Sequence, residues 1–168
     1  MFKRIRLRLR DMKTINKLIS GADEQAGICG EEEPGAEHFI LSALNLPDGS
    51  AKRVLERLGA DPSKFREAIK EQYNEPLRSV GINPDIIETH PEPIESKKVF
   101  HNSKPSGQHL IKSLYDLKQK DKDRPLLSAH VLSAVTKMDH GVAIRAFKIL
   151  GINQGQLTRA VNEELDLI

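Results

Sequence analysis

The sequence predicts an all-α fold in which two tandem, pseudo-symmetric helical repeats form one compact domain. The first observation is internal similarity, because residues 35–72 match residues 127–164 at a constant offset of 92 residues without a gap. The second is that apolar residues recur at spacings of three and four between short breaks rich in Gly, Pro and Asp. A repeated unit buries its apolar face partly against its copy, so both repeats are expected to share one core.

Identical residues at equivalent positions mark where each repeat starts and turns. The identical pairs are His38 and His130, Gly49 and Gly141, Ala51 and Ala143, Arg53 and Arg145, Leu58 and Leu150, Gly59 and Gly151, Ala68 and Ala160, and Glu71 and Glu163. Gly59 and Gly151 are each predicted to end a helix in the left-handed conformation. His38 and His130 are predicted to lie at helix starts, where each imidazole closes a hydrogen-bond network against the repeat partner.

The first ten residues, MFKRIRLRLR, alternate apolar and basic side chains, as is typical of a short strand. We therefore predict a basic N-terminal arm over residues 1–10. One interpretation is that the arm binds acidic partners, nucleic acid or anionic lipid. The other, which we favour, is a solvated terminus that pins one apolar face, because a local run of charge is weak support for a partner.

The first repeat is predicted over residues 11–73 as helices joined by short turns. Its helix signals are, in order, Asp11 as an N-cap, Gly27 or Gly30 as the end of the first helix, Ser50 as the N-cap of a helix reaching Leu58, and Asp61 with Pro62 before an inward stripe of Phe65, Ala68 and Ile69. Each signal combines a residue that satisfies free backbone groups with an apolar face of helical spacing.

The region after the first repeat contains five prolines, at positions 76, 84, 91, 93 and 105. Prolines at this density prevent a continuous helix, so residues 74–105 are predicted to be the linker between the repeats. The second repeat is predicted over residues 106–168. Its first helix, which includes Val99 and Phe100, is expected to be broken or shifted near Pro105. A solvated loop is expected over residues 118–124, and a helix is expected to start at Pro125.

Length and charge limit the possible function classes. A chain of 168 residues with 38% apolar composition can bury the core of one domain or of two small fused lobes. A net charge of +2, from 26 basic and 24 acidic residues, does not indicate a nucleic-acid or membrane partner. The single cysteine excludes an intramolecular disulfide, and no apolar run reaches the length of a membrane span or secretion signal. The expected location is the cytoplasm.

Catalytic and metal-binding motifs are missing from the sequence. There is no G-x-x-x-x-G-K-[ST] phosphate loop, no short H-x-x-x-H pair, no CxxC and no nucleophile elbow. We therefore expect no enzyme activity, no cofactor and no metal site. Cys29 has no cationic neighbour in the sequence to lower the pKa of its thiol, so it is not expected to act as a nucleophile.

The segments GAEHFILSAL and AKRVLERLGAD resemble the Clp amino-terminal domain, the doubled all-helical unit at the front of Clp-type AAA+ unfoldases. Repeats of this family begin with a Gly-Thr-Glu-His-like sequence. The first repeat keeps Gly35, Glu37 and His38, and the second keeps His130 after the small hydroxyl of Ser128. The resemblance covers nearly the whole chain. It implies a double Clp-N fold without ATPase modules, either as a separate protein, which the lack of linker composition in residues 160–168 favours, or as a fragment.

The resemblance also implies a function. Domains of this family do no chemistry and dock substrates and adaptors, so the expected function is protein or peptide binding that delivers or regulates clients of an ATP-dependent protease or chaperone. The expected partners are a Clp-type unfoldase, an adaptor or a client protein, without membrane or nucleic acid. The alternative is binding of nucleic acid or an anionic surface through the Arg-rich arm.

The family resemblance implies one candidate ligand site. In some members the glutamate before the histidine in each repeat holds the guanidinium of a phosphorylated arginine through paired hydrogen bonds. Here Ala129 stands at the second glutamate position and Ala36 replaces the threonine before Glu37. Glu37 is therefore the best ligand-binding candidate, Ser128 a distant second, and any phosphoarginine binding is expected to be one-sited and weak.

Overall fold

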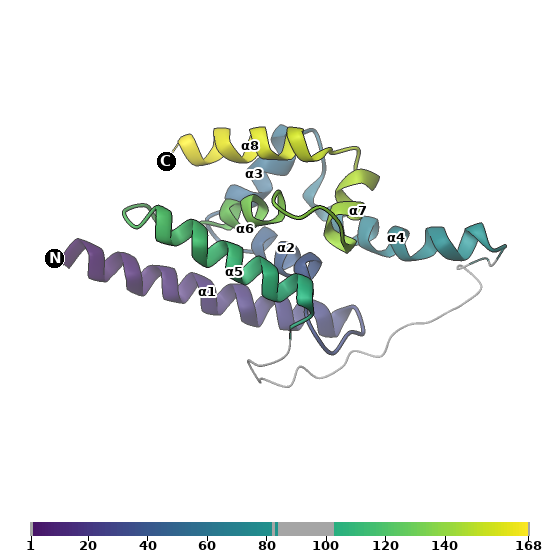
Figure 1. Ribbon diagram of the computed structural model, residues 1–168, viewed down its shortest axis with the longest axis horizontal. Helices are drawn as coiled ribbons and strands as arrows, with labels where there is room; N and C mark the ends of the chain where they lie inside the picture. The colour runs from purple at the N-terminus through teal and green to yellow at the C-terminus, as the bar shows by residue number, and fades with distance from the viewer. Residues whose placement is uncertain (1, 82, 84–102, 168) are drawn as a thin grey trace.

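The fold was determined as a computed structural model that describes residues 2–81, 83 and 103–167 (Figure 1). All regular elements in these ranges are helical, which confirms the predicted all-α class. They are α1 (Phe2–Ile28), α2 (Ala36–Leu44), α3 (Ser50–Arg57), the 3₁₀ turn η1 (Pro62–Lys64), α4 (Phe65–Ser79), α5 (Pro105–Lys120), α6 (Ser128–Val135), α7 (Val142–Ile149) and α8 (Gln154–Asp166). Within the described ranges, no helix combines the length and the apolar character needed to cross a bilayer.

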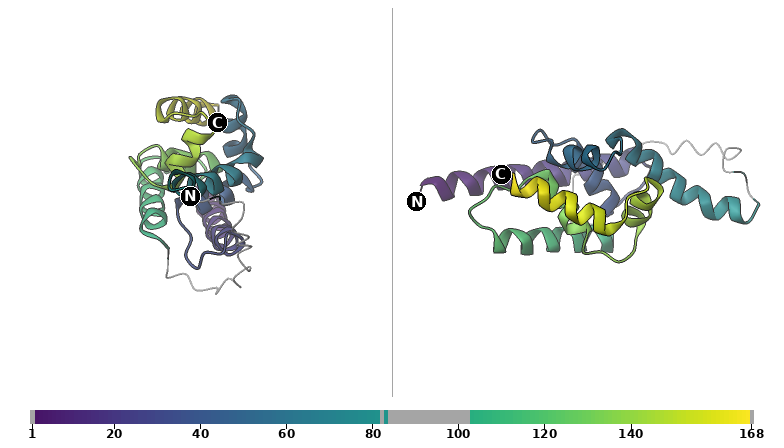
Figure 2. Two further views of the ribbon diagram at one scale, coloured as in Figure 1. Left: turned by 90° about the vertical axis from the view of Figure 1, so that its right-hand side faces the viewer. Right: turned by 90° about the horizontal axis from the view of Figure 1, so that it is seen from above.

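The two repeats pack through reciprocal contacts between equivalent helices. Within each repeat, the first helix packs on the second, as α1 does on α2 and α5 on α6. Between repeats, α3 contacts α6 and α8, and the equivalent α7 contacts α2 and α4. The long helices α1 and α5 lie on one side of the bundle and α8 with α3 on the other (Figures 1 and 2). The reciprocal contacts make one core rather than two.

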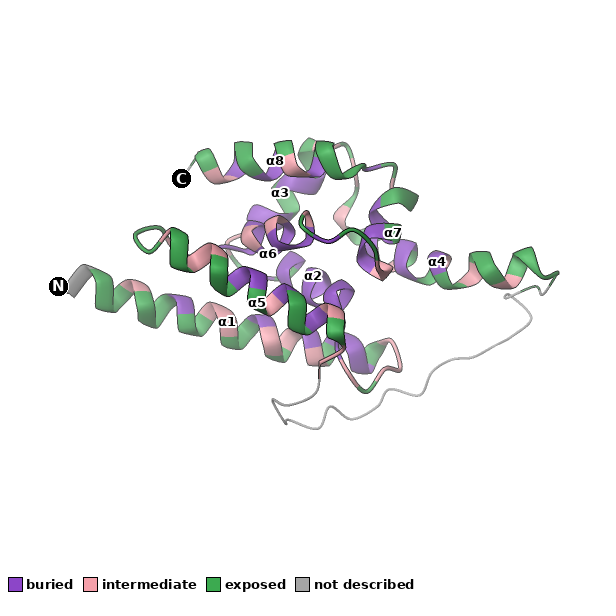
Figure 3. Cartoon of the chain, in the orientation of Figure 1, coloured by how far each residue is buried: buried purple, intermediate pink, exposed green. Residues whose placement is uncertain are grey.

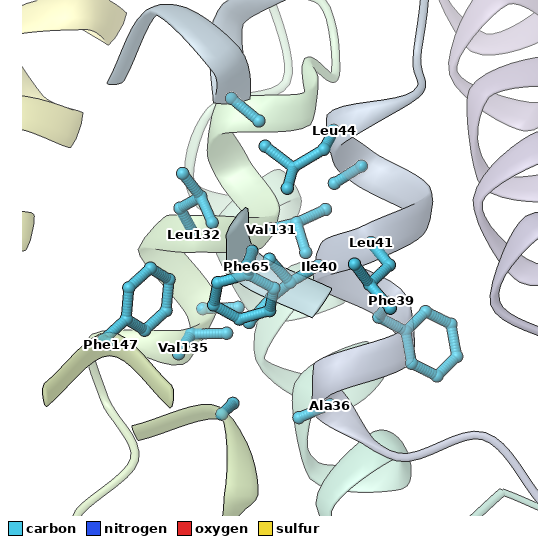
Figure 4. Close-up of a cluster of buried hydrophobic side chains, with 14 of the residues drawn as sticks. Ala36, Phe39, Ile40, Leu41, Leu44, Phe65, Val131, Leu132, Val135 and Phe147 are labelled. Carbon is cyan, nitrogen blue, oxygen red and sulfur yellow. The ribbon is translucent and has the colours of Figure 1, made fainter. Parts of the chain in front are cut away.

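The centre of this core is formed by α2 and α6. All nine residues of α2 are buried, including Glu37 and His38 (Figure 3). The rings of Phe65 from α4 and Phe147 from α7 meet between the repeats, with centroids 5.0 Å apart (Figure 4). Burying a large apolar side chain contributes about 1.5–3 kcal/mol, so this contact between α4 and α7 stabilises the packing of one repeat on the other.

Glycine turns end the equivalent helices of both repeats. Gly59 and Gly151 have φ angles of 73° and 75° directly after α3 and α7, as predicted for left-handed C-caps. Gly49 and Gly141 also have positive φ and precede the same two helices. One prediction was wrong in detail, because Gly49 is the N-cap of α3 and Ser50 is its first residue.

The predicted strand at the N-terminus is wrong, because α1 is one helix from Phe2 to Ile28. A lone strand here would have no neighbouring strand, whereas a helix satisfies its own backbone and suits Arg and Leu. Asp11 is therefore inside the helix rather than at its start. Its buried carboxylate accepts a hydrogen bond from the Leu126 amide (2.8 Å) and pairs with Lys118 Nζ (3.0 Å).

Four other boundaries differ from the prediction. Helix α4 continues past residue 73 to Ser79 with Pro76 inside it, in a part of the helix that is mostly exposed. Pro105 begins α5 rather than interrupting a helix, because proline suits the first helical position. Helix α5 includes residues 118–120 of the predicted loop, and α6 begins at Ser128 rather than Pro125. Residues 84–102, with Val99, Phe100 and most of the predicted linker, lie outside the described residues.

Replacing Phe65 with alanine is expected to destabilise the whole domain by about 3–5 kcal/mol, because it leaves a cavity against Phe147 between the repeats. The measurement is urea unfolding followed by circular dichroism. Leu167→Ala is the control, since Leu167 is 71% exposed and should change stability little. Unfolding of one repeat while the other stays folded would contradict the shared core.

Candidate functional site

The two histidines close the starts of equivalent helices. His38 Nδ1 accepts a hydrogen bond from the Gly35 amide (2.9 Å), and His130 Nδ1 accepts one from the Leu127 amide (3.1 Å). Each histidine is the third residue of its helix, and its imidazole caps the start of that helix. The predicted hydrogen-bond network against the other repeat is therefore wrong. Burial lowers the pKa of both histidines, that of His38 to about 4, so both are neutral at neutral pH.

The structure places Glu37 inside the protein. Only 2% of its side chain is exposed, and its Oε1 atom has no hydrogen-bond partner among the described residues. Burial is the largest effect on this carboxyl group and raises its pKa. The carboxylate also requires glycine at position 35, because any side chain there would collide with it.

Lys104 and Glu31 cover the Glu37 carboxylate. Lys104 Nζ donates a hydrogen bond to Glu31 Oε2 and lies 3.9 Å from Glu37 Oε1. The Lys104 amide is bound to the Pro34 carbonyl (3.1 Å), which ties the start of α5 to the loop before α2. The best candidate ligand residue thus already has an internal cation beside it. A guanidinium could reach Glu37 only after Lys104 and Glu31 move.

Glu31, Glu37 and His38 bring possible metal ligands within 4.8 Å of one another, although the sequence predicts no metal site. The hydrogen-bonding pattern does not suit a metal. His38 Nδ1 accepts a hydrogen bond, so the neutral ring carries its proton on Nε2, whereas a metal-bound imidazole normally donates from its second nitrogen. The Lys104 ammonium also supplies the positive charge at this place. We therefore assign no metal to these residues.

Ser128 lies at a buried junction between the repeats. Its Oγ accepts a hydrogen bond from the Ala51 amide, and Ser50 Oγ accepts one from the Ala129 amide, both at 2.9 Å. Both hydroxyls donate to Asp48 Oδ2, at 2.7 Å from Ser128 and 2.5 Å from Ser50. Neither serine is exposed, so Ser128 joins the repeats and is not displayed to a ligand. Partial burial works to raise the pKa of Asp48, but these hydrogen bonds outweigh it and lower the pKa.

A second reciprocal contact involves the paired arginines. Arg53 Nε donates to Glu164 Oε1, and Arg145 Nε donates to Gln72 Oε1, both at 2.7 Å. Gln72 and Glu164 are 92 residues apart, the same offset that relates the arginines. The sequence comparison identified the arginines but missed their partners, because glutamine in one repeat stands for glutamate in the other.

Cys29 has a cationic neighbour that the sequence did not reveal. Arg66 Nη1 lies 3.7 Å from Cys29 Sγ. Burial nevertheless has the larger effect and raises the pKa of the thiol, so the thiolate is disfavoured. The geometry agrees with the expectation that Cys29 is not a nucleophile, for a different reason.

An apolar groove of about 610 Å³ lies between α1 and α5. Its floor is apolar and its rim is mainly basic. The apolar residues are Leu7, Met12, Ile15, Ile19, Ile111, Leu114, Tyr115 and Leu126, and the polar ones are Arg4, Arg8, Asp11, Lys118, Gln119 and Lys122. Met12 and Tyr115 are 59% and 63% exposed. Exposed large apolar side chains gathered in a hollow are typical of a binding site.

The sequence analysis did not predict this groove. Helical periodicity shows which residues share a face but not whether another element covers that face. The structure brings together α1 and α5, the equivalent first helices of the two repeats. Neither of the predicted ligand residues, Glu37 and Ser128, lines this groove.

Replacing Asp48 with asparagine is expected to destabilise the domain by about 1–3 kcal/mol at pH 7, because Ser50 and Ser128 lose a charged acceptor. The pKa of Asp48 is lowered on folding, so its contribution is present above the unfolded pKa and disappears as the pH falls through the folded pKa. Urea unfolding of both proteins from pH 7 to pH 2 should show the difference shrinking at the acidic end. A difference independent of pH would contradict this role.

Comparison with known proteins identifies the family. The family model described as the Clp repeat (R) N-terminal domain matches residues 13–104, more than half of the chain. Among curated proteins, chaperone protein ClpC1 of Arabidopsis thaliana, a chloroplastic protein, is 40% identical over 63 residues, which are 38% of this chain and 6% of that protein. Chaperone protein ClpB of Oceanobacillus iheyensis is 24% identical over 155 residues, 90% of this chain and 16% of that protein. The chain thus spans only a small part of these relatives.

Solved structures show the same fold at low sequence identity. The N-terminal domain of Hsp104 from Candida albicans matches with a TM-score of 0.59 and 16% identity, covering 89% of this chain and 87% of that one. The N-terminal domain of ClpD from Arabidopsis thaliana matches with a TM-score of 0.57 and 17% identity, covering 94% and 92%. Both structures support the fold alone. Together with the family match, they show that this chain belongs to the Clp repeat N-terminal domain family.

Proposed function

We propose that this chain is a non-catalytic protein- or peptide-binding module that docks segments of other proteins. The observation that carries the proposal is the groove between α1 and α5, which has an apolar floor and exposes Met12 and Tyr115. Membership of the Clp repeat N-terminal domain family supports the proposal, because the curated relatives are named as chaperones, which act on other proteins.

The partner is proposed to be a Clp-type unfoldase, an adaptor or a client protein. The module would deliver clients to an ATP-dependent protease or chaperone in trans, or compete with the amino domain of such a motor for ligands. A cytoplasmic location stays a prediction, since several relatives are chloroplastic proteins. Phosphoarginine binding through Glu37 is not part of the proposal, because the carboxylate is buried under Lys104 and Glu31.

Removing apolar side chains from the groove is expected to weaken binding of a permanently unfolded model protein whose cysteines are alkylated. Met12→Ala and Tyr115→Ala should each raise the dissociation constant about fivefold to tenfold, since a well-buried apolar contact contributes about 1–2 kcal/mol. Fluorescence anisotropy measures the affinity. Val80→Ala is the control, because Val80 is 70% exposed and lies far along the chain from the groove residues. Equal affinities for all four proteins would contradict docking at the groove.

A phosphoarginine peptide is expected to bind the natural protein weakly. Lys104→Ala should strengthen binding about tenfold, because it removes the ammonium that lies beside the Glu37 carboxylate. The measurement is calorimetric titration of the natural protein, Lys104→Ala, and Lys104→Ala combined with Glu37→Gln, and the last should lose the gain. Tight binding by the natural protein that Glu37→Gln abolishes would instead show that the cover opens readily in solution.

A second candidate function, binding of nucleic acid or an anionic surface through the N-terminal residues, is favoured by one observation. Arg6 and Arg10 are exposed on α1 and do not line the groove. Deleting residues 1–10 would not separate the two functions, because Arg4, Leu7 and Arg8 belong to the groove.

Substitution of these two arginines distinguishes the functions. Arg6→Glu combined with Arg10→Glu should remove salt-sensitive binding of duplex DNA, if such binding occurs, and leave docking of the unfolded model protein unchanged. Loss of unfolded-protein binding in this variant would show that general charge, and not the groove, holds the ligand.

A further inference from the structure

We propose that the groove between α1 and α5 accepts an amphipathic helix whose apolar face is flanked by acidic side chains. The inference rests on the proposed function and specifies the partner of the same site. It follows from three features of the groove: the spacing of its apolar residues, the lack of free backbone groups along its walls, and the distribution of charge on its rim.

The apolar residues on both walls recur with helical spacing. Helix α1 contributes Met12, Ile15 and Ile19, and α5 contributes an equivalent row that includes Ile111 and Tyr115. Two such rows leave a channel of about 610 Å³ between two helices that lie near each other (Figures 1 and 2). A third helix that presents apolar residues at i, i+3, i+4 and i+7 can place them along this channel.

A helix fits the walls better than an extended segment does. An extended peptide gains most of its affinity by pairing its backbone with a free sheet edge. Here both walls are helices, whose backbone N–H and C=O groups are bonded within the helix except at the ends. A bound segment must therefore satisfy its own backbone, and an α-helix does so.

The positive charge at the rim of the groove favours acidic side chains on both sides of the bound helix. Four cations, Arg4, Arg8, Lys118 and Lys122, surround the groove with one acid, Asp11. Lys118 is already paired with Asp11 at 3.0 Å, and Arg4 lies 3.4 Å from an exposed acid outside the groove, Asp123.

Two of these cations remain open to a ligand. Arg8 and Lys122 have no ion-pair partner in the described part of the chain, and they stand on opposite sides, one on α1 and the other in the loop after α5. Carboxylates on both flanks of a bound helix would lie beside them.

The same features disfavour a nucleic acid or a flat bilayer as the occupant. A duplex offers phosphates to the cations but would leave the apolar floor, including Met12 and Tyr115, without a partner. A bilayer surface would contact the exposed outer cations of α1, such as Arg6, at least as strongly as the cations at the groove rim. A protein helix alone uses both the concave apolar floor and the cations on both sides.

Three synthetic helical peptides test the inference. All carry leucine at i, i+3, i+4 and i+7, and their flanking positions hold Glu, Gln or Lys. Anisotropy titrations at low salt should give the tightest binding for the Glu peptide, about tenfold weaker binding for Gln, and the weakest for Lys, because two or three ion pairs at partly exposed sites supply about that difference. At 0.5 M salt the Glu and Gln peptides should differ less than about threefold, since salt screens exposed charges.

Charge reversal on the protein provides the matched comparison. Arg8→Glu with Lys122→Glu should reverse the preference, so that the Lys peptide binds more tightly than the Glu peptide. Arg6→Glu with Lys52→Glu makes the same change in net charge at exposed positions outside the groove and should keep the original order. Circular dichroism confirms that both variants fold.

The outcomes separate the inference from the function on which it rests. If the Glu and Gln peptides bind equally well at low salt, the groove binds apolar helices without regard to charge, and the inference is overturned while docking stands. The control variant is Arg6→Glu with Lys52→Glu. If it changes the order of the peptide affinities as much as Arg8→Glu with Lys122→Glu does, the charge of the whole surface and not the groove selects the ligand. That result also overturns the inference. If no peptide binds and no unfolded protein binds, both the inference and the proposed function fail.

Discussion

The fold depends on each repeat covering the central helix of the other. Helix α2 has all nine residues buried, and a helix of that length is not stable by itself in water. Its cover comes from α6 and α7 of the second repeat as well as from α1. The buried Ser50, Ser128 and Asp48 contacts fix how the repeats meet, because each serine accepts an amide hydrogen bond from the opposite repeat. The groove between α1 and α5 exists because this packing holds the two first helices near each other.

Features that repeat at a fixed offset could be predicted from the sequence, and features without a counterpart could not. The constant offset identified the histidines that cap α2 and α6 and the glycines Gly59 and Gly151. These positions depend on local backbone geometry, which sequence neighbours determine. Residues 1–10 lie outside the matched stretches 35–72 and 127–164, and their alternation of apolar and basic residues suggested a strand. This segment is helical because no strand lies beside it and the helix bonds its own backbone.

The same limit explains which contacts of Glu37 and Asp11 the sequence analysis missed. Glu37 has a recognisable sequence context, but its burial depends on Lys104, which lies on the far side of the linker in the sequence. Asp11 has the appearance of an N-cap, yet its partners are Leu126 and Lys118 of the second repeat. Long-range contacts of polar groups leave no periodic pattern. The groove was missed for a related reason, since an apolar stripe has the same periodicity whether or not another element covers it.

The two repeats differ at the position of Glu37. In the first repeat the space beside His38 holds the Glu37 carboxylate, with Lys104 and Glu31 above it. In the second, Ala129 stands in place of that glutamate and is buried, and His130 lines a hollow of about 390 Å³ that Ala129 does not line. Neither half presents an exposed carboxylate at this position. The α1 and α5 helices, by contrast, expose Met12 and Tyr115, and two cations without an ion-pair partner among the described residues, Arg8 and Lys122, line the same groove. Apolar and cationic side chains that could act together on one ligand are therefore found side by side in the groove between the first helices, which is why we propose it, rather than the position of Glu37, as the binding site.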